Sequence, residues 1–279
     1  MTLLLSLVSA FLYGVADFSG GSATRRNRVF SVMFLTQAAG ALVVLIASPL
    51  VGPSAPRTAD IAWGAAAGAL GFVGVAALYA GLAKHTAAIV SPLSALIGAI
   101  LPAAFGALIG ERPSGTALVG IALCVPAIAL LAYEKGETED RGKLRASFLY
   151  GLVAGLGFGG FFVLISRTSP ASGIWPLLGS RATTLVIVIA ILAFGKNRFS
   201  LARGSVAIAL FAGAADMLAN VFFLLATRTG LLIIATLVTS LYPAPTVVLA
   251  RIFQGQKISL PRAAGIALAL GGVALIGMR

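Results

Sequence analysis

Long apolar runs separated by short polar segments dominate the chain. Runs of about 18 or more predominantly apolar residues are long enough to cross a bilayer as α-helices. Most of the polar segments are short, so we expect consecutive helices to be antiparallel and adjacent. The pattern predicts an all-α membrane protein with ten transmembrane helices. We predict these helices at residues 2–22, 29–50, 61–83, 87–109, 115–133, 146–166, 172–194, 204–226, 230–253 and 260–278.

The two halves of the chain repeat one another at a constant offset of 145 residues. Tyr13-Gly14 aligns with Phe158-Gly159, and Gly120-Ile121-Ala122 aligns with Gly265-Ile266-Ala267. Each half holds five predicted helices, and an odd number of crossings makes the second copy insert upside down. Inverted repeats of this kind surround a central site in many secondary transporters. We therefore predict two inverted five-helix repeats around a central cavity.

The repeats also define the predicted domain organisation. A charged segment with both acidic and basic residues separates the two halves and is expected to be a solvated linker. The chain leaves no room for a further soluble domain. We predict a first repeat over residues 1–133, the linker over 134–145 and a second repeat over 146–279.

Composition agrees with a membrane protein whose partner is the lipid bilayer. Hydrophobic residues make up 59% of the chain, charged residues 10%, and the mean hydropathy is +1.03. A soluble domain of this size would have to expose more polar surface than that. The net charge of +12 does not indicate a nucleic-acid partner, because the basic residues lie in short loops between apolar runs.

The distribution of Lys and Arg bears on orientation. The odd-numbered loops hold fourteen of these residues, and the even-numbered loops with the C-terminus hold five. By the positive-inside rule, the odd-numbered loops are cytoplasmic and both termini lie outside. The fourteen are Arg25, Arg26, Arg28, Lys84, Lys135, Arg141, Lys143, Arg145, Lys196, Arg198, Arg203, Arg251, Lys257 and Arg262.

The residues typical of enzymes and of metal or nucleotide sites are scarce. His85 is the only histidine, and the single Cys124 lies inside an apolar run. One histidine without clustered cysteines or acids makes no metal site. The chain has no Gly-Lys-Ser/Thr phosphate-binding sequence. We therefore expect no cofactor, no metal and no enzymatic activity.

Prolines indicate interruptions in the fourth and ninth predicted helices. Pro92 and Pro102 lie in the fourth helix, and Pro243 and Pro245 lie at the corresponding place in the second repeat. A proline within a helix frees a carbonyl and tends to kink or break the helix. Interrupted helices at matching places in two repeats point to a transport site. The alternative is that these prolines only produce packing kinks.

Three polar residues inside the seventh and eighth helices need a partner or a function. Arg181, Asp216 and Asn220 lie within apolar runs, and Asp216 and Asn220 share one helical face. One interpretation is a structural ion pair between Arg181 and Asp216. In the other, Arg181 binds a substrate carboxylate, while Asp216 binds an ammonium group or a proton.

Asp17, near the end of the first helix, is the second acid that we consider for proton coupling. It lies close to Arg25 and Arg26. One interpretation is an anchor at a helix end near water. The other is a proton-coupling or substrate-binding carboxylate, as for Asp216.

Aromatic and hydroxyl residues complete the predicted substrate site. Aromatic rings suit organic cations and apolar amino acids. Tyr13 and Phe158 are repeat partners, and Phe162, Trp175 and Tyr242 are further rings. The alternative for each ring is that it only contacts lipid or packs in the core. The alternative for the serine and threonine hydroxyls near the prolines is that they only donate hydrogen bonds to carbonyls freed by those prolines. Besides Arg181, Asp216 and Asn220, the predicted site comprises Tyr13, Tyr79, Phe158, Ser91 and Thr239.

A short motif occurs once in each half, before a glycine-containing last helix. Gly110-Glu111-Arg112-Pro113-Ser114 aligns with Gly255-Gln256-Lys257-Ile258-Ser259. The pattern resembles the EamA repeat of the drug/metabolite transporter superfamily over nearly the whole chain. Glu111 becomes Gln256, so the position cannot perform the same acid chemistry twice. We interpret it as a feature of a loop and a helix end.

The resemblance implies a basket of helices with alternating access. Among the members of this superfamily, we favour the bacterial amino acid exporters as the best comparison. We expect a secondary carrier that exports small amphiphilic metabolites, amino acids first. It would act in a bacterial-type inner membrane, as a monomer or homodimer. The resemblance also implies cytoplasmic termini, opposite to the Lys and Arg count. The alternatives are a proton-coupled exporter of drugs or quaternary cations and, more remotely, a membrane scaffold or lipid-modifying enzyme.

Overall fold

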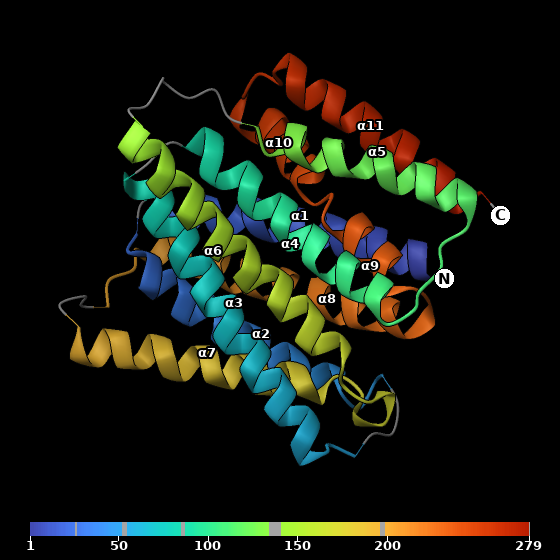
Figure 1. Ribbon diagram of the computed structural model, residues 1–279. Helices are drawn as coiled ribbons and strands as arrows, with labels where there is room; N and C mark the ends of the chain where they lie inside the picture. Colours follow the sequence, from blue (N-terminus) through green and yellow to red (C-terminus); the bar gives the residue numbers. More distant parts are fainter. Residues whose placement is uncertain (26, 52–54, 85–86, 134–140, 196–198, 279) are drawn as a thin grey trace.

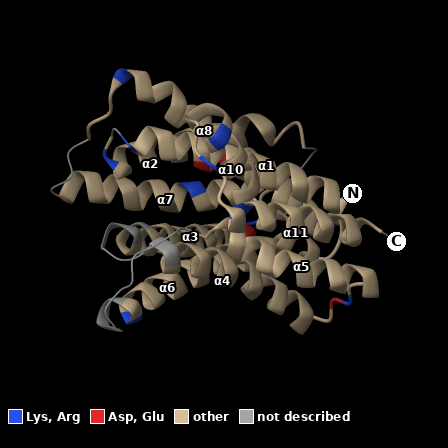
Figure 2. Ribbon diagram, turned by 90° about the horizontal axis from the view of Figure 1, so that it is seen from above, with Lys and Arg blue, Asp and Glu red and all other residues tan. Residues whose placement is uncertain are grey.

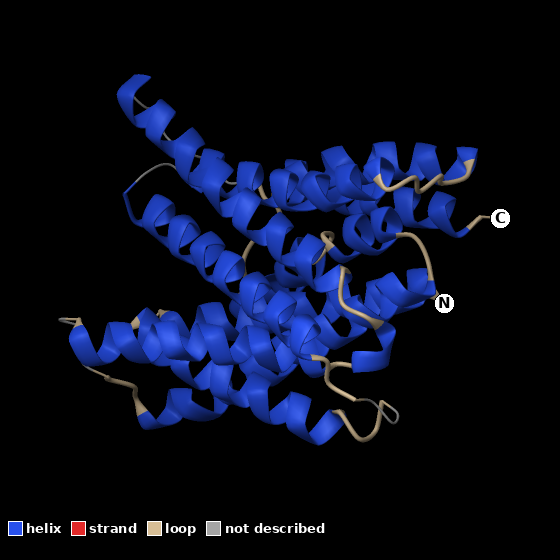
Figure 3. Ribbon diagram, turned by 60° about the horizontal axis from the view of Figure 1, so that its bottom comes forward, coloured by secondary structure: helices blue, strands red, loops and turns tan. Residues whose placement is uncertain are grey.

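The computed structural model describes the chain except for residues 26, 52–54, 85–86, 134–140, 196–198 and 279 (Figure 1). His85, most of the predicted linker and several basic residues counted for orientation lie outside this part: Arg26, Lys135, Lys196, Arg198 and Arg279. The described residues form helices and loops without strands (Figure 3). The helices are α1 (Thr2–Thr24), α2 (Val29–Ala47), α3 (Thr58–Lys84), α4 (Ala87–Leu108), α5 (Gly115–Leu131), α6 (Arg141–Ser166), the 3₁₀ turn η1 (Pro170–Ser172), α7 (Trp175–Phe194), α8 (Arg203–Thr229), α9 (Leu232–Thr239), α10 (Pro243–Gln254) and α11 (Leu260–Gly277).

These helices confirm the predicted ten-span membrane architecture. Nine spans within the described residues have the length and hydropathy to cross a membrane, with α9 and α10 together forming one of them. The apolar helix α5, at 17 residues, supplies the tenth. Residues 141–145, which the sequence places in the linker, form the start of α6.

The ninth span is broken, as predicted, but the fourth is not. Between α9 and α10 the chain makes a tight turn in which Tyr242 N–H donates to Thr239 O (3.1 Å) and Ala244 N–H donates to Leu241 O (2.9 Å). These carbonyls would otherwise lack their donors, because residues 243 and 245 are both prolines. In α4, Pro92 and Pro102 lie ten residues apart within one continuous helix. Isolated prolines remove one bond each, so the predicted break in this helix is wrong.

The most extensive helix packing joins one repeat to the other. Helix α1 packs mainly on α8, as α6 packs on α3, and α5 packs on α11. Consecutive helices contact each other far less, so the expectation that neighbours in sequence are adjacent is wrong. Equivalent residues of the two repeats make equivalent contacts where α5 packs on α11. A Cβ on Gly120 would lie 2.8 Å from Ile276 Cγ1, and one on Gly265 would lie 3.0 Å from Leu131 Cγ, which are equivalent pairs at the 145-residue offset.

Glycines permit this close approach of helices from different repeats. Gly151, Gly155 and Gly159 form one row along α6. A Cβ on Gly155 would lie 2.5 Å from Ile97 Cβ of α4, and one on Gly159 would lie 2.9 Å from Leu101 Cβ. Small residues at four-residue spacing allow backbones to pack closely in lipid, where no hydrophobic effect drives helices together.

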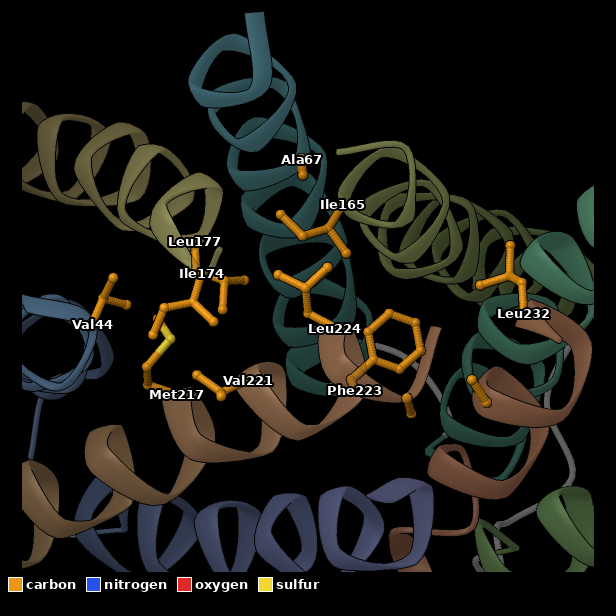
Figure 4. Packing of buried hydrophobic residues seen from close by; sticks show 12 residues of the cluster. Val44, Ala67, Ile165, Ile174, Leu177, Met217, Val221, Phe223, Leu224 and Leu232 are labelled. Carbon is orange, nitrogen blue, oxygen red and sulfur yellow. The ribbon is translucent and has the colours of Figure 1, made fainter. Parts of the chain in front are cut away.

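The termini and the even-numbered loops lie at one end of the bundle, which we call the even-loop end (Figures 1 and 2). The opposite end, the odd-loop end, carries the odd-numbered loops. The largest apolar core lies toward the even-loop end. It gathers the ends of α2, α6 and α8 and the starts of α3, α7 and α9 (Figure 4). Its residues are Val44, Ala67, Ile165, Ile174, Leu177, Met217, Val221, Phe223, Leu224, Ala226, Leu232 and Ala235.

Candidate functional site

The predicted ion pair between Arg181 and Asp216 forms between α7 and α8. Arg181 Nη2 donates to Asp216 Oδ2, and Arg181 Nη1 donates to Gln37 Oε1 of α2 at 2.7 Å. The Arg181 side chain is 9% exposed, whereas that of Asp216 is 36% exposed. The arginine is therefore held by two partners inside the bundle, while the carboxylate keeps an accessible face.

Asn220 extends this centre by one helical turn. Its Nδ2 donates to the Asp216 backbone oxygen at 2.8 Å and lies 3.4 Å from Asp216 Oδ2. Within the described residues, Asn220 Oδ1 and Arg181 Nε are buried without a hydrogen-bond partner. Buried polar atoms normally have partners, so the centre retains one free acceptor and one free donor.

Gln37 is the functional candidate that the sequence analysis missed. Its amide lies on α2 and receives the second hydrogen bond of Arg181. On the same helix, Gly40 leaves space for the guanidinium, because a Cβ there would lie 3.0 Å from Arg181 Nε. The available signal was a polar amide within an apolar span, which in a membrane needs a partner.

An aromatic cluster surrounds Tyr13 beside this centre. The Tyr13 ring lies 6.0 Å from that of Tyr242, at the break between α9 and α10, and 6.3 Å from that of Phe162 on α6. Phe162 in turn packs on Phe223, with ring centroids 4.4 Å apart. Tyr13 is also within electrostatic range of Asp216 and Arg181. The structure therefore brings Tyr13 to the charged centre.

Phe158 has a different environment from its repeat partner Tyr13. A Cβ on Gly74 of α3 would lie 2.8 Å from Phe158 Cδ1, and one on Gly98 of α4 would lie 3.4 Å from Phe158 Cβ. Phe158 therefore fills the junction of α3, α4 and α6. Tyr79 lies on α3, and its side chain is outside the part of the structure that is described.

The predicted hydroxyl residues Ser91 and Thr239 lie on α4 and α9, and their surroundings differ. In α4, Ser94 Oγ donates to Ser91 O at 2.9 Å, so the Ser91 carbonyl serves a local helix bond. In α9, Thr236 and Thr239 are fully buried, and in the described part of the chain neither Oγ1 has a hydrogen-bond partner. Thr239 is therefore the stronger candidate, and it lies one helical turn before Tyr242.

A pocket opens at the odd-loop end between α1, α10 and the start of α11. Its volume is about 210 Å³, and among the described residues Asp17 is the only acidic one that lines it. Asp17 is exposed to the pocket, although it lies seven residues before the end of α1, about 10 Å along the helix. Basic residues complete the lining with polar and apolar ones: Arg25, Lys257, Arg262, Ser22, Thr246, Gln254, Gln256, Phe18, Gly21, Val247 and Ala250.

The even-loop end, in contrast, is held together by polar contacts around the apolar core. Asp60 of α3 accepts hydrogen bonds from Ser169 N–H (3.0 Å) and from the Ser172 hydroxyl (2.5 Å). Arg228, at the end of α8, donates to Gly173 O at 2.6 Å. The charged centre thus lies between a pocket at one end and a packed, hydrogen-bonded layer at the other.

Comparison with known proteins adds the family. The model of the EamA-like transporter family matches residues 1–133 and 145–278. No curated protein matches the chain. A solved structure titled only "Crystal structure of protein" is similar with a TM-score of 0.81 and 17% sequence identity, over 98% of this chain and 94% of its own. At that identity the likeness establishes the fold alone.

Proposed function

Because the chain belongs to the EamA-like transporter family, we propose that it is a secondary carrier that exports small amphiphilic metabolites, amino acids first. It is a multi-pass membrane protein of a family of transporters. The substrate class, the direction, the bacterial inner-membrane location and the monomeric or homodimeric state belong to the proposal.

The observation that carries the proposal is the Arg181–Asp216 centre. An amino acid presents one carboxylate and one ammonium group, and the centre offers one group of each opposite sign. Asp216 keeps an accessible face, and Arg181 Nε has no hydrogen-bond partner among the described residues. The ammonium group of a zwitterion could therefore contact Asp216 without first dismantling the pair, whereas its carboxylate would reach the buried Arg181 Nε only after neighbouring side chains move.

The broken ninth span favours the ammonium group of such a substrate. The C-terminus of α9 lies next to Tyr242, inside the membrane-spanning region. The C-terminal end of a helix carries partial negative charge, and aromatic faces attract cations. Tyr13 and Tyr242 lie together at this helix end. Their rings could also contact the apolar part of a substrate.

Pocket size favours a metabolite over a drug. The volume of about 210 Å³ is below the roughly 300–1,000 Å³ of pockets that hold drug-sized ligands. The second candidate, a proton-coupled exporter of quaternary cations, is favoured by one observation. Asp17 is the one acid in the lining that the structure describes, and it is close enough to Asp216 for their charges to interact.

The charge on the odd-loop end supports export as the proposed direction of transport. This end holds most of the basic loop residues, and the positive-inside rule makes it cytoplasmic. The pocket then opens to the cytoplasm, and the even-loop end is the closed external side. A substrate entering from the cytoplasm and leaving when the even-loop end opens would be exported.

Uptake of radiolabelled amino acids into proteoliposomes tests the proposal. We expect measurable uptake with the native chain, and a loss of tenfold or more with Arg181→Ala or Asp216→Asn. Gly271→Ala is the matched control, because its Cβ would only make an ordinary contact at 3.9 Å with Leu123. The proposal is wrong if both charge variants stay folded and transport at the native rate. Loss of transport of a quaternary cation, but not of amino acids, on Asp17→Asn would favour the second candidate.

A further inference from the structure

The Glu111 side chain joins the two repeats at the even-loop end. Glu111 lies between α4 and α5, and its Oε1 accepts the N–H of Leu232 at 2.6 Å while its Oε2 accepts the N–H of Ile233 at 2.9 Å. These are the first two residues of α9. The first N–H groups of a helix have no partner within the helix. A carboxylate satisfies them with charge-assisted bonds and interacts favourably with the helix dipole.

This contact is part of the closed layer. Gly106, in the last turn of α4, lies against both partners: a Cβ there would come 2.6 Å from Glu111 Oε2 and 2.8 Å from Ile233 Cγ1. Leu232 and Ala235 belong to the apolar core of this end. The carboxylate therefore fixes the start of α9 against the end of α4. If the chain exports as proposed above, this is where the even-loop end opens for substrate release.

The repeat gives this contact a counterpart at the opposite end. At the 145-residue offset, Glu111 corresponds to Gln256, and Leu232 corresponds to Ala87, the first residue of α4. In the structure, Gln256 lines the open pocket, and its Nε2 donates to Gln254 Oε1 at 2.9 Å. Inverted repeats reach their second access state by one repeat moving against the other around a fixed site. Exchange of the two conformations would place Gln256 at the start of α4.

We propose that Glu111 and Gln256 are positioning residues that set which end of the transporter rests closed. The Glu111 carboxylate accepts two N–H groups with two oxygens and carries a charge. The Gln256 amide has only one acceptor oxygen and no charge. The cap at the even-loop end is therefore the stronger one, and the resting protein favours a closed even-loop end with an open pocket.

Alkylation of reporter cysteines tests the proposal without any substrate. In a Cys124→Ala background, Ala235→Cys reports on the closed core and Ala250→Cys reports on the pocket. The rate of maleimide labelling is measured on the full chain in liposomes. We expect Glu111→Gln to raise the labelling rate at position 235 about fivefold to tenfold. The reason is that one neutral hydrogen bond to the start of α9 would replace two charge-assisted ones. We expect Gln256→Glu to lower labelling at position 250 by a similar factor.

The control variant is Arg112→Gln, which removes the neighbouring charge while its described hydrogen bond goes only to the Glu111 backbone oxygen. It should leave both rates unchanged. Unchanged labelling at position 235 in a folded Glu111→Gln protein would overturn the proposal. If Glu111→Gln does not fold, Gln256→Glu tests the proposal by itself, because this variant removes no helix cap. Unchanged labelling at position 250 in Gln256→Glu would then overturn the proposal. Neither result depends on which solute is transported.

Discussion

Comparison of a single and a double variant at Arg181 and Asp216 separates a structural ion pair from a substrate site. Removing one partner of a fully buried pair costs about 3–5 kcal/mol, because it leaves an unpaired charge. In Asp216→Asn, Arg181 keeps Gln37, and the side chain at position 216 is 36% exposed rather than fully buried. We therefore expect a smaller loss, about 2 kcal/mol, or roughly 4–8 °C in melting temperature.

The double variant Arg181→Met/Asp216→Asn removes the buried charge along with its partner. Replacement of a buried pair by residues of similar volume is often neutral for stability. We expect its melting temperature, measured on the detergent-solubilised protein, to return to within a few degrees of the native value. Transport in proteoliposomes should stay at least tenfold below native, because the two groups that we propose to bind the substrate are gone. Native transport by the stable double variant would refute the substrate role and leave a structural pair.

Two further predictions concern the pocket and the helix packing. Asp17→Asn keeps the size of the side chain that lines the pocket, so binding of an uncharged solute should persist while proton-driven accumulation falls at least fivefold. Dissipation of a pH gradient in liposomes measures the proton flux. An unchanged proton flux would exclude Asp17 as a coupling group. Gly155→Leu must displace α4, because even a Cβ would lie 2.5 Å from Ile97 Cβ, and we expect destabilisation of about 1–3 kcal/mol. A Cβ on Gly204 would meet nothing within 4 Å, so Gly204→Leu should melt like the native protein. Equal melting of the two variants would contradict the packing.

The features that the sequence predicted correctly depend on local chemistry. The spans follow from runs of apolar residues. In lipid, all backbone polar groups must be hydrogen-bonded within the protein, and only helices and closed barrels achieve this. The pairing of Arg181 with Asp216 is found because isolated charges in the bilayer are costly and few partners exist. The roles of these residues in substrate binding stay predictions.

The features that the sequence did not predict depend on contacts between distant residues. Gln37 meets Arg181 across 144 residues, and Glu111 meets Leu232 across 121, and no periodicity encodes such distances. Helix α4 continues through Pro92 and Pro102 and packs against α6 and α9, neither of which the proline pattern alone indicates. The association of α1 with α8 rather than α2 is likewise a property of the two repeats together.

Counterflow through proteoliposomes tests most directly whether this chain carries amino acids through a site that opens to one side at a time. Vesicles loaded with an unlabelled amino acid are diluted into a trace of the same labelled compound. Our account predicts a transient accumulation of label above equilibrium with the native chain, and none with Arg181→Met/Asp216→Asn. Absence of accumulation with the native chain for every amino acid, in vesicles containing folded protein, would contradict it.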